Sequence, residues 1–118
     1  MDMASSLVIA IVAILHVYFL ILEMFLWTKP LGLKAFRQTL ESAEVTKVLA
    51  ANQGLYNGFL AAGLLWGLTL GEHGFDIKVF FLSCVVVAGV YGAATASRAI
   101  LFIQALPAAI GLALLLFV

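Results

Sequence analysis

Hydrophobic positions form four long stretches that are separated by short polar segments. The stretches cover roughly residues 7–27, 48–70, 79–97 and 99–118. Each is close to the roughly 20 residues that a helix needs to cross the hydrocarbon core of a bilayer. Pro30 and Gly32 follow the first stretch and stop a helix, and Arg98 alone separates the last two. The pattern predicts an all-α integral membrane four-helix bundle, a single transmembrane domain over residues 1–118.

Residues 33–47 follow a different pattern. The segment is charged, but its apolar positions recur at spacings of three and four, at Leu33, Phe36, Leu40 and Ala43. This spacing is typical of an amphipathic helix. The helix either lies on the membrane surface or continues straight into the second span.

Composition supports a lipid environment. Of the 118 residues, 65% are hydrophobic and only 10% are charged, too few to cover a soluble domain of this size. The formal net charge is zero, so there is no basic patch for nucleic acid, and such a partner is not expected. Cys84 is the only cysteine, which excludes an intramolecular disulfide and a thiolate zinc site, and no metal site is predicted.

The distribution of basic residues predicts the orientation. Lys29, Lys34, Arg37 and Lys47 surround the first loop, and Arg98 lies in the third, whereas the opposite side holds only Lys78. Cytoplasmic loops retain lysine and arginine. We therefore expect a multi-pass protein of the cell membrane, in contact with lipid, with both termini on the non-cytoplasmic side. The N-terminus lacks the positive region of a secretory signal, so the first stretch is expected to be a retained span.

Polar residues within the spans are the candidates for chemistry, because burying them in hydrocarbon costs several kcal/mol unless they find partners. Their positions along the spans predict one layer in the cytoplasmic half of the bundle. The ligand-binding candidates in this layer are Glu23, Asn52, Gln53, Tyr56, Asn57, Tyr91 and Arg98, with Thr95 and Gln104 beside them.

Helical spacing groups these candidates into faces. Asn52 with Tyr56, and Gln53 with Asn57, are four apart, so each pair is expected to share a face. Glu23 is expected to pair with Arg98 or with Lys47, helped by the amides. The lone His16 is interpreted as a packing residue.

Small residues follow two faces of the second span. One series is Gly54, Gly58 and Ala62, and the other is Gly63, Gly67 and Gly71. Small residues four apart let helices approach closely, so neighbours are expected on both sides. If one neighbour belongs to another copy of the chain, the protein is a homo-oligomer; a compact monomer would use the same residues.

Two resemblances add to this reading. The run from His16 to Trp27, with Ala50–Phe59, resembles an uncharacterised family of short bacterial membrane proteins, classed as a domain of unknown function. That resemblance covers essentially the whole chain and implies no activity.

The layout is also similar to that of the membrane-associated proteins in eicosanoid and glutathione metabolism (MAPEG). Asn52 with Tyr56 matches their second-helix motif, and Tyr91 with Arg98 matches a tyrosine and an arginine that contact glutathione. The resemblance implies four spans, a trimer and glutathione as cofactor. Val48 and Leu55 depart from it, since that family has an arginine and a glutamate there.

Two functions remain open from the sequence. In the first, the polar layer binds a small polar or amphiphilic ligand, with Arg98 as the contact for an anion. In the second, the protein is non-catalytic and structural, and the same residues only join helices. A small transporter is a weaker third reading, since only Pro107 suggests an interrupted helix. No reaction can be named.

Overall fold

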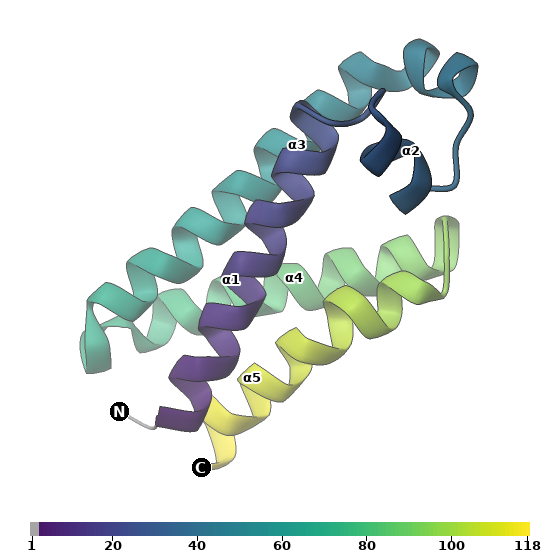
Figure 1. The fold of residues 1–118 in the computed structure, drawn as a ribbon. Coiled ribbons are helices and arrows are strands. Elements are labelled where there is room, and N and C mark those ends of the chain that lie inside the picture. Colours follow the sequence, from purple (N-terminus) through teal and green to yellow (C-terminus); the bar gives the residue numbers. More distant parts are fainter. Residues whose placement is uncertain (1–2) are drawn as a thin grey trace. The chain divides into compact units, whose positions relative to one another are not determined.

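The computed structural model describes residues 3–118, which are helical apart from short connections. In chain order the elements are α1 (Met3–Met24), α2 (Pro30–Ala35), α3 (Leu40–Thr69), the 3₁₀ turn η1 (Gly71–Gly74), α4 (Phe75–Thr95), the π-helical turn η2 (Leu101–Ala105) and α5 (Leu106–Phe117). Figure 1 traces them from the purple N-terminus to the yellow C-terminus. The all-α prediction is confirmed.

Two helical segments are long and apolar enough to cross a membrane, Met3–Met24 and Gly71–Thr95. Leu101–Phe117 is apolar but shorter. α3 has the length, at 30 residues, but charged residues in its first turns and the amides of Asn52, Gln53 and Asn57 lower its hydropathy. The four-span arrangement therefore remains a proposal.

The chain forms two compact units, and α1 and α3 each contribute to both. The larger unit comprises Met1–Ile14 and Leu60–Val118, and the smaller unit comprises Leu15–Phe59. The core of the larger unit draws on four helices. Its buried members are Ile9, Val12 and Ala13 of α1, Leu64 of α3, Leu82 and Val85 of α4, and Ala108 of α5.

In the larger unit, the backbones of α4 and η2 approach each other closely at Gly89. A Cβ on Gly89 of α4 would lie 2.6 Å from the backbone nitrogen of Ala105, so only glycine fits there. The predicted irregularity at Pro107 is present, since the π-helical turn η2 gives way to α5 one residue before it. Proline removes a backbone donor from the helix, and such π-helical turns occur where the regular hydrogen-bond ladder is interrupted.

The smaller unit is organised by the end of α2. The backbone N–H of Gln38 donates to Leu33 (2.9 Å) and that of Arg37 to Lys34 (3.3 Å), the two bonds of a Schellman motif. Arg37 has φ +53, the left-handed conformation that glycine usually supplies. Thr39 then caps α3, because its hydroxyl accepts the N–H of Ser42 at 3.1 Å.

These caps alter the predicted boundaries. α1 begins at Met3, before the predicted span, and ends earlier, at Met24, where the N–H groups of Phe25 and Leu26 both bond to Ile21 and close its last turn. The predicted amphipathic segment is divided by the Schellman motif into the short α2 and the first turns of α3. From Leu40 it continues straight into the second span, which is one of the two predicted alternatives.

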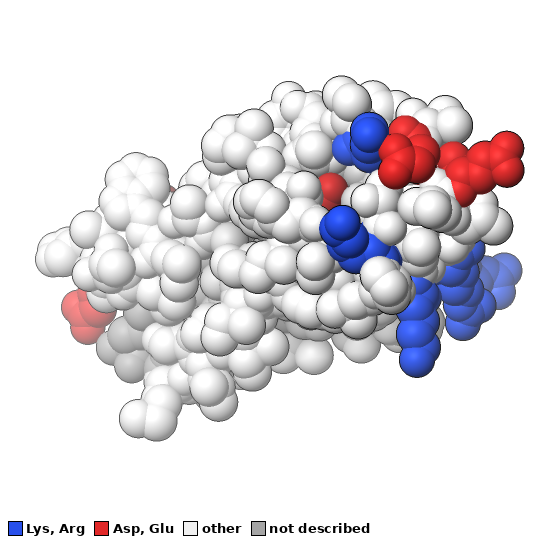
Figure 2. Space-filling model, turned by 45° about the horizontal axis from the view of Figure 1, so that its top comes forward, with Lys and Arg blue, Asp and Glu red and all other residues white. Residues whose placement is uncertain are grey.

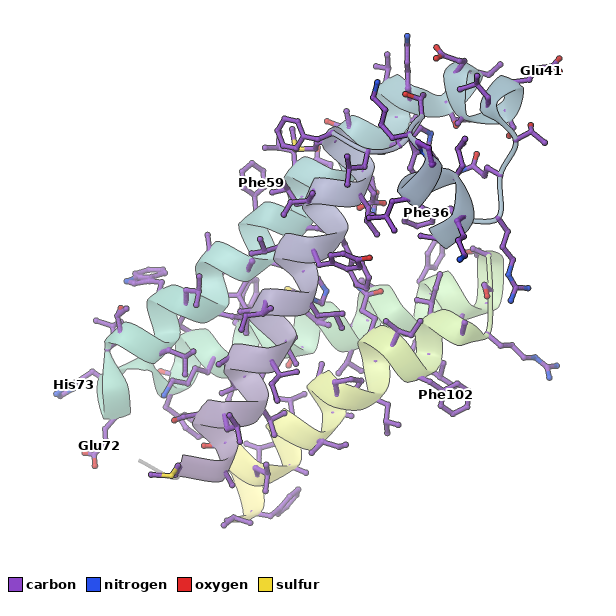
Figure 3. The ribbon with its side chains drawn as sticks, viewed as in Figure 1. Phe36, Glu41, Phe59, Glu72, His73 and Phe102 are labelled. Atoms are coloured by element: carbon purple, nitrogen blue, oxygen red, sulfur yellow. The ribbon has the colours of Figure 1, made fainter. Side chains whose placement is uncertain are left out.

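Large apolar side chains remain exposed on both units. Val48 in the smaller unit is 77% exposed, and Val87 and Phe102 in the larger unit are 68% and 64% exposed. Phe59 and Phe102 project outward in Figure 3, and uncharged surface dominates the face shown in Figure 2. Apolar exposure on this scale marks an interaction surface, and lipid is the solvent that it suits.

Candidate functional site

Glu23 and Asn57 form the buried polar contact of the smaller unit. Glu23 lies in the last turn of α1 and is 9% exposed, and Asn57 lies on α3 and is 6% exposed. The side-chain Nδ2 of Asn57 donates a hydrogen bond of 2.5 Å to Oε1 of Glu23. Two residues that the sequence places in one polar layer are thus in direct contact.

Two glycines bring the helices together at this contact. A Cβ on Gly54 would lie 2.7 Å from Cγ of Met24 and 3.2 Å from the carbonyl oxygen of Leu20. A Cβ on Gly58 would lie 2.7 Å from Cδ1 of Leu20. Asn57 sits between these glycines on the sequence, so its short side chain can reach the carboxyl group on α1.

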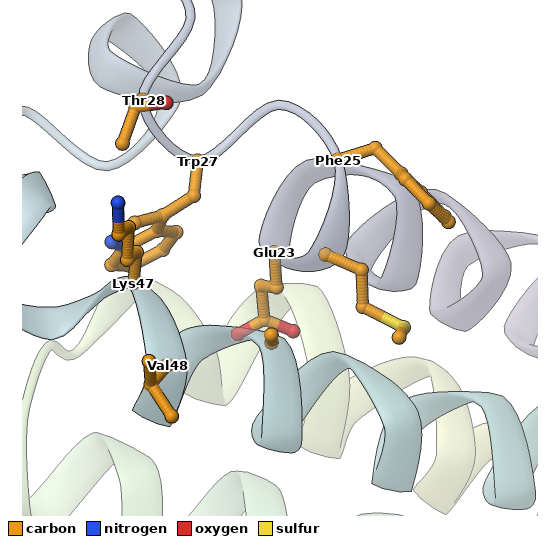
Figure 4. Close-up of a pocket in the computed structure, with 8 residues that line it drawn as sticks. Glu23, Phe25, Trp27, Thr28, Lys47 and Val48 are labelled. Atoms are coloured by element: carbon orange, nitrogen blue, oxygen red, sulfur yellow. The ribbon is translucent and has the colours of Figure 1, made fainter.

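A cavity of about 350 Å³ opens beside this pair, entirely within the smaller unit (Figure 4). Its wall is made of Met24, Phe25, Val48 and Ala51, and its polar side chains are those of Glu23, Trp27, Thr28 and Lys47. In Figure 4 the carboxyl group of Glu23 lies below Trp27 and Lys47.

The carboxyl group of Glu23 has one oxygen outside its bond with Asn57, and Glu23 lines this cavity. Within residues 15–59 the hydrogen bond from Asn57 involves only Oε1. In the described part of the chain, no buried side-chain nitrogen or oxygen lacks a hydrogen-bond partner. Oε2, which takes no part in that bond, therefore keeps some accessible surface. A carboxyl group that is mostly buried but presents one oxygen to a cavity can accept a hydrogen bond from a ligand.

Trp27 is held in place at the cavity. Its indole N–H donates to Oγ1 of Thr46 at 3.2 Å, and that hydroxyl donates in turn to the backbone oxygen of Ser42 at 3.2 Å. Its ring packs against Phe36, with centroids 4.8 Å apart. The indole is therefore pre-positioned as a rigid part of the wall.

Lys47 is engaged elsewhere. Its Nζ lies 3.0 Å from Oε2 of Glu44, in an exposed pair three residues apart on α3. The predicted Glu23–Lys47 pair is therefore replaced by two contacts, Glu23 with Asn57 and Lys47 with Glu44. The reason is geometric, since Glu44 lies on the same helix within reach of Lys47. The alternative pairing of Glu23 with Arg98 stays a prediction.

The other predicted residues are exposed. Asn52, Gln53 and Tyr56 lie on the surface of α3, and the Tyr56 ring contacts Phe59 with centroids 5.8 Å apart. Gln53 and Asn57, four residues apart on α3, differ in burial: Gln53 is exposed, whereas Asn57 is buried and bonds to Glu23 on α1. Tyr91 and Arg98 are exposed in the larger unit, where Thr95 donates its hydroxyl to the backbone oxygen of Tyr91 at 2.7 Å.

The burial of His16 agrees with its interpretation as a packing residue. His16 is fully buried and packs edge-on against Phe19, with centroids 5.5 Å apart. His73 is exposed in η1, and Figure 3 shows it projecting from the turn beside Glu72.

Lys78 is a buried residue whose burial the sequence does not predict, because a lysine near a loop is expected to be solvated. It is 0% exposed, and its Nζ donates to the backbone oxygen of Gly71 at 2.9 Å. Gly71 has φ +58 and follows α3, so the ammonium group lies where cations stabilise a helix C-terminus. A Cβ on Gly67 would lie 2.8 Å from Cγ of Lys78, so the signal in the sequence is the glycine that leaves room for the lysine stem. Lys78 is a structural cap.

Comparison with known proteins places the chain in a family. Residues 10–116 match the family model described as "Protein of unknown function (DUF1304)". The chain belongs to the DUF1304 family. A curated relative, the uncharacterised protein YpaA of Lactococcus lactis subsp. lactis (strain IL1403), is 26% identical over 106 residues, covering 88% of this chain and 89% of YpaA. No solved structure gives a significant match. DUF1304 membership confirms the resemblance to an uncharacterised family and assigns no activity.

Proposed function

We propose that this DUF1304 protein is an integral membrane protein that binds a small amphiphile in the cavity beside Glu23. The observation that carries the proposal is a carboxyl group, nine-tenths buried, that lines a cavity of about 350 Å³ and has one oxygen outside its bond with Asn57. Ligand sites typically combine apolar walls, a few placed polar groups and a volume of about 300–1,000 Å³.

The membrane setting is supported by two long apolar helical segments and by the exposed apolar side chains of both units. We propose that Leu101–Phe117 and the apolar part of α3 complete four spans. With Lys29, Lys34, Arg37 and Lys47 in the cytoplasm, the cavity opens in the cytoplasmic half and both termini lie on the other side.

We also propose that a second copy of the chain is a partner. The small residues of α3, which suggest this partner in the sequence, are not the reason. The two glycine faces of α3 are filled within the chain, by Leu20 and Met24 against Gly54 and Gly58, and by Phe81 and Lys78 against Gly63 and Gly67. The support is instead the exposed amides of Asn52 and Gln53, which polar contacts between helices would satisfy. Disulfide crosslinking of Asn52→Cys in a Cys84→Ala background, in native membranes, tests this partner. Covalent dimers support it, and an absence of crosslinks at Asn52 together with a monomeric mass contradicts it.

The MAPEG-like fold, its trimer and a glutathione contact by Tyr91 and Arg98 remain predictions from resemblance. Tyr91 and Arg98 belong to the larger unit, and the residues that line the Glu23 cavity belong to the smaller unit.

The alternative function is structural, and one observation favours it. The Glu23–Asn57 hydrogen bond links α1 to α3, as buried polar residues commonly do in membrane bundles. In that case the cavity would have no ligand and the pair would only fix the helices.

Fluorescence of Trp27 distinguishes the two functions. The chain has two tryptophans, so Trp66→Phe leaves Trp27 as the reporter in the cavity wall, and Trp27→Phe leaves Trp66 as the matched control. A brominated fatty-chain amphiphile titrated into protein in nanodiscs should quench Trp27 saturably and Trp66 only by partitioning. If both tryptophans are quenched in proportion to the concentration, no site exists and the structural function holds.

A further inference from the structure

The charges around the cavity indicate which head group it accepts. Glu23 and Lys47 are the ionisable side chains that line it. Lys47 already has a carboxylate partner, since its Nζ lies 3.0 Å from Glu44. Within the smaller unit Glu23 is paired only with the neutral amide of Asn57. Of the two ionisable side chains that line the cavity, the acid is therefore the one without a counter-charge.

Hydrogen-bonding capacity leads to the same chemistry. A carboxylate accepts hydrogen bonds and donates none. Asn57 occupies Oε1 and leaves Oε2 outside that bond, so the ligand group that complements an ionised Glu23 must donate. The strongest donors to a carboxylate are cationic N–H groups. An anionic head group would instead meet the Glu23 oxygen and would have to displace Glu44 from Lys47.

The remaining wall suits an apolar chain and a cation. Met24, Phe25, Val48 and Ala51 contribute apolar surface, and Phe25 and Val48 are exposed at 65% and 77%. The indole of Trp27 is held rigidly beside them, and aromatic faces attract ammonium groups.

We propose that the ligand is an amphiphile with a protonated primary amine, whose N–H group donates to Oε2 of Glu23 while its chain lies against the apolar wall. This inference rests on the proposed function. It differs from the sequence-based expectation of an anion held by Arg98.

Probes of equal chain length test the head group. Dodecylamine, dodecanol, dodecanoate and dodecyl phosphate are added separately to the full-length protein in phosphatidylcholine nanodiscs, and the unfolding temperature is measured. Only a ligand that binds the native state raises this temperature. Dodecylamine should raise it saturably and by more than the other three probes. The gain should be lost in Glu23→Gln and kept in Glu41→Gln, a matched change to an exposed acid in the same unit that neither lines the cavity nor pairs with Lys47.

A second measurement uses the unaltered protein, in case Glu23→Gln does not fold. A hydrophobic carbodiimide adds to a buried carboxyl group to give an N-acylurea, and mass spectrometry locates the adduct. Dodecylamine should raise the fraction of Glu23 left unmodified at concentrations where dodecanol does not, with the dodecyl amide that a primary amine forms with an activated carboxyl group counted as modified. Equal protection by the two probes overturns the inference.

The outcomes separate the inference from the function on which it rests. If dodecanoate or dodecyl phosphate stabilises the protein and Lys47→Met abolishes the effect, the amine is wrong and amphiphile binding in this cavity stands. If dodecanol is as effective as dodecylamine, the head-group argument is wrong. If no probe changes the unfolding temperature or protects Glu23, both the inference and the proposed function fail.

Discussion

Asn57 reaches Glu23 from the neighbouring helical segment, and its amide nitrogen lies 2.5 Å from the carboxyl oxygen Oε1. Both side chains are buried, and each provides a hydrogen-bond partner for the polar group of the other. The contact defines one end of the cavity and fixes which carboxyl oxygen remains for a ligand. It also gives the account its first testable prediction.

Asn57→Leu should destabilise the protein. The substitution leaves the Glu23 carboxyl without its donor, and an unsatisfied buried group costs about 1 to 3 kcal/mol. Thermal unfolding in detergent measures the loss. Asn52→Leu is the matched control, because Asn52 is an exposed amide on the same helix. Equal unfolding temperatures for the two variants would contradict a stabilising role for the Asn57–Glu23 bond.

Gly89→Ala should destabilise the larger unit more than Gly58→Ala destabilises the smaller one. At Gly89 a Cβ would meet backbone atoms of Ala105, which cannot rotate away, whereas at Gly58 it meets only the flexible Leu20 side chain. Overpacking costs about 1 to 3 kcal/mol, and the cost rises when the neighbour cannot move. Chemical denaturation of both variants measures the difference, and the reverse order would contradict the close approach of α4 and η2.

Arg37→Gly should stabilise the protein. Arg37 occupies a left-handed conformation at the end of α2, which costs a non-glycine residue about 1 to 2 kcal/mol. Glycine adopts this conformation without that cost. Part of the gain in stability is offset, because glycine raises the conformational entropy of the unfolded chain. We expect a small rise in unfolding temperature. Lys34→Gly, inside α2, should lower it, and a fall for Arg37→Gly would show that the Schellman motif is not formed.

Cysteine accessibility tests the proposed orientation. In a Cys84→Ala background, His73→Cys places a thiol in the exposed turn η1, and Ser42→Cys places one in the exposed first turns of α3. A membrane-impermeant maleimide should label His73→Cys in intact cells and Ser42→Cys only after permeabilisation. The opposite pattern would invert the topology, and labelling of both in intact cells would contradict a membrane barrier between them.

The sequence predicts the helices well because the apolar stretches are long and their breaks contain proline, glycine or charge. It identifies Glu23 and Asn57 as site candidates because polar groups in such stretches need partners. It could not pair them, since the direction that Asn57 faces depends on how closely Gly54 and Gly58 let α3 approach α1. Gln53, four residues earlier, carries the same polarity and is exposed.

The burial of Lys78 shows the same limit. Its charge suggests a loop, and only the tertiary position of Gly67 reveals the space for its stem. Lys47 likewise finds its partner locally, in Glu44. Side-chain pairing of this kind is set by packing, which spacing along one helix does not specify.

Photolabelling tests the central claim, amphiphile binding beside Glu23, most directly. A dodecylamine that carries a diazirine on its chain is photolysed with the protein in nanodiscs, with and without excess unlabelled dodecylamine, and the labelled residues are located by mass spectrometry. The account predicts that the competed label falls on Met24, Phe25, Val48 or Ala51, which line the cavity. Label on these residues that excess dodecylamine does not reduce, or label spread equally over exposed positions of α4 such as Val87 and Val90, would contradict it.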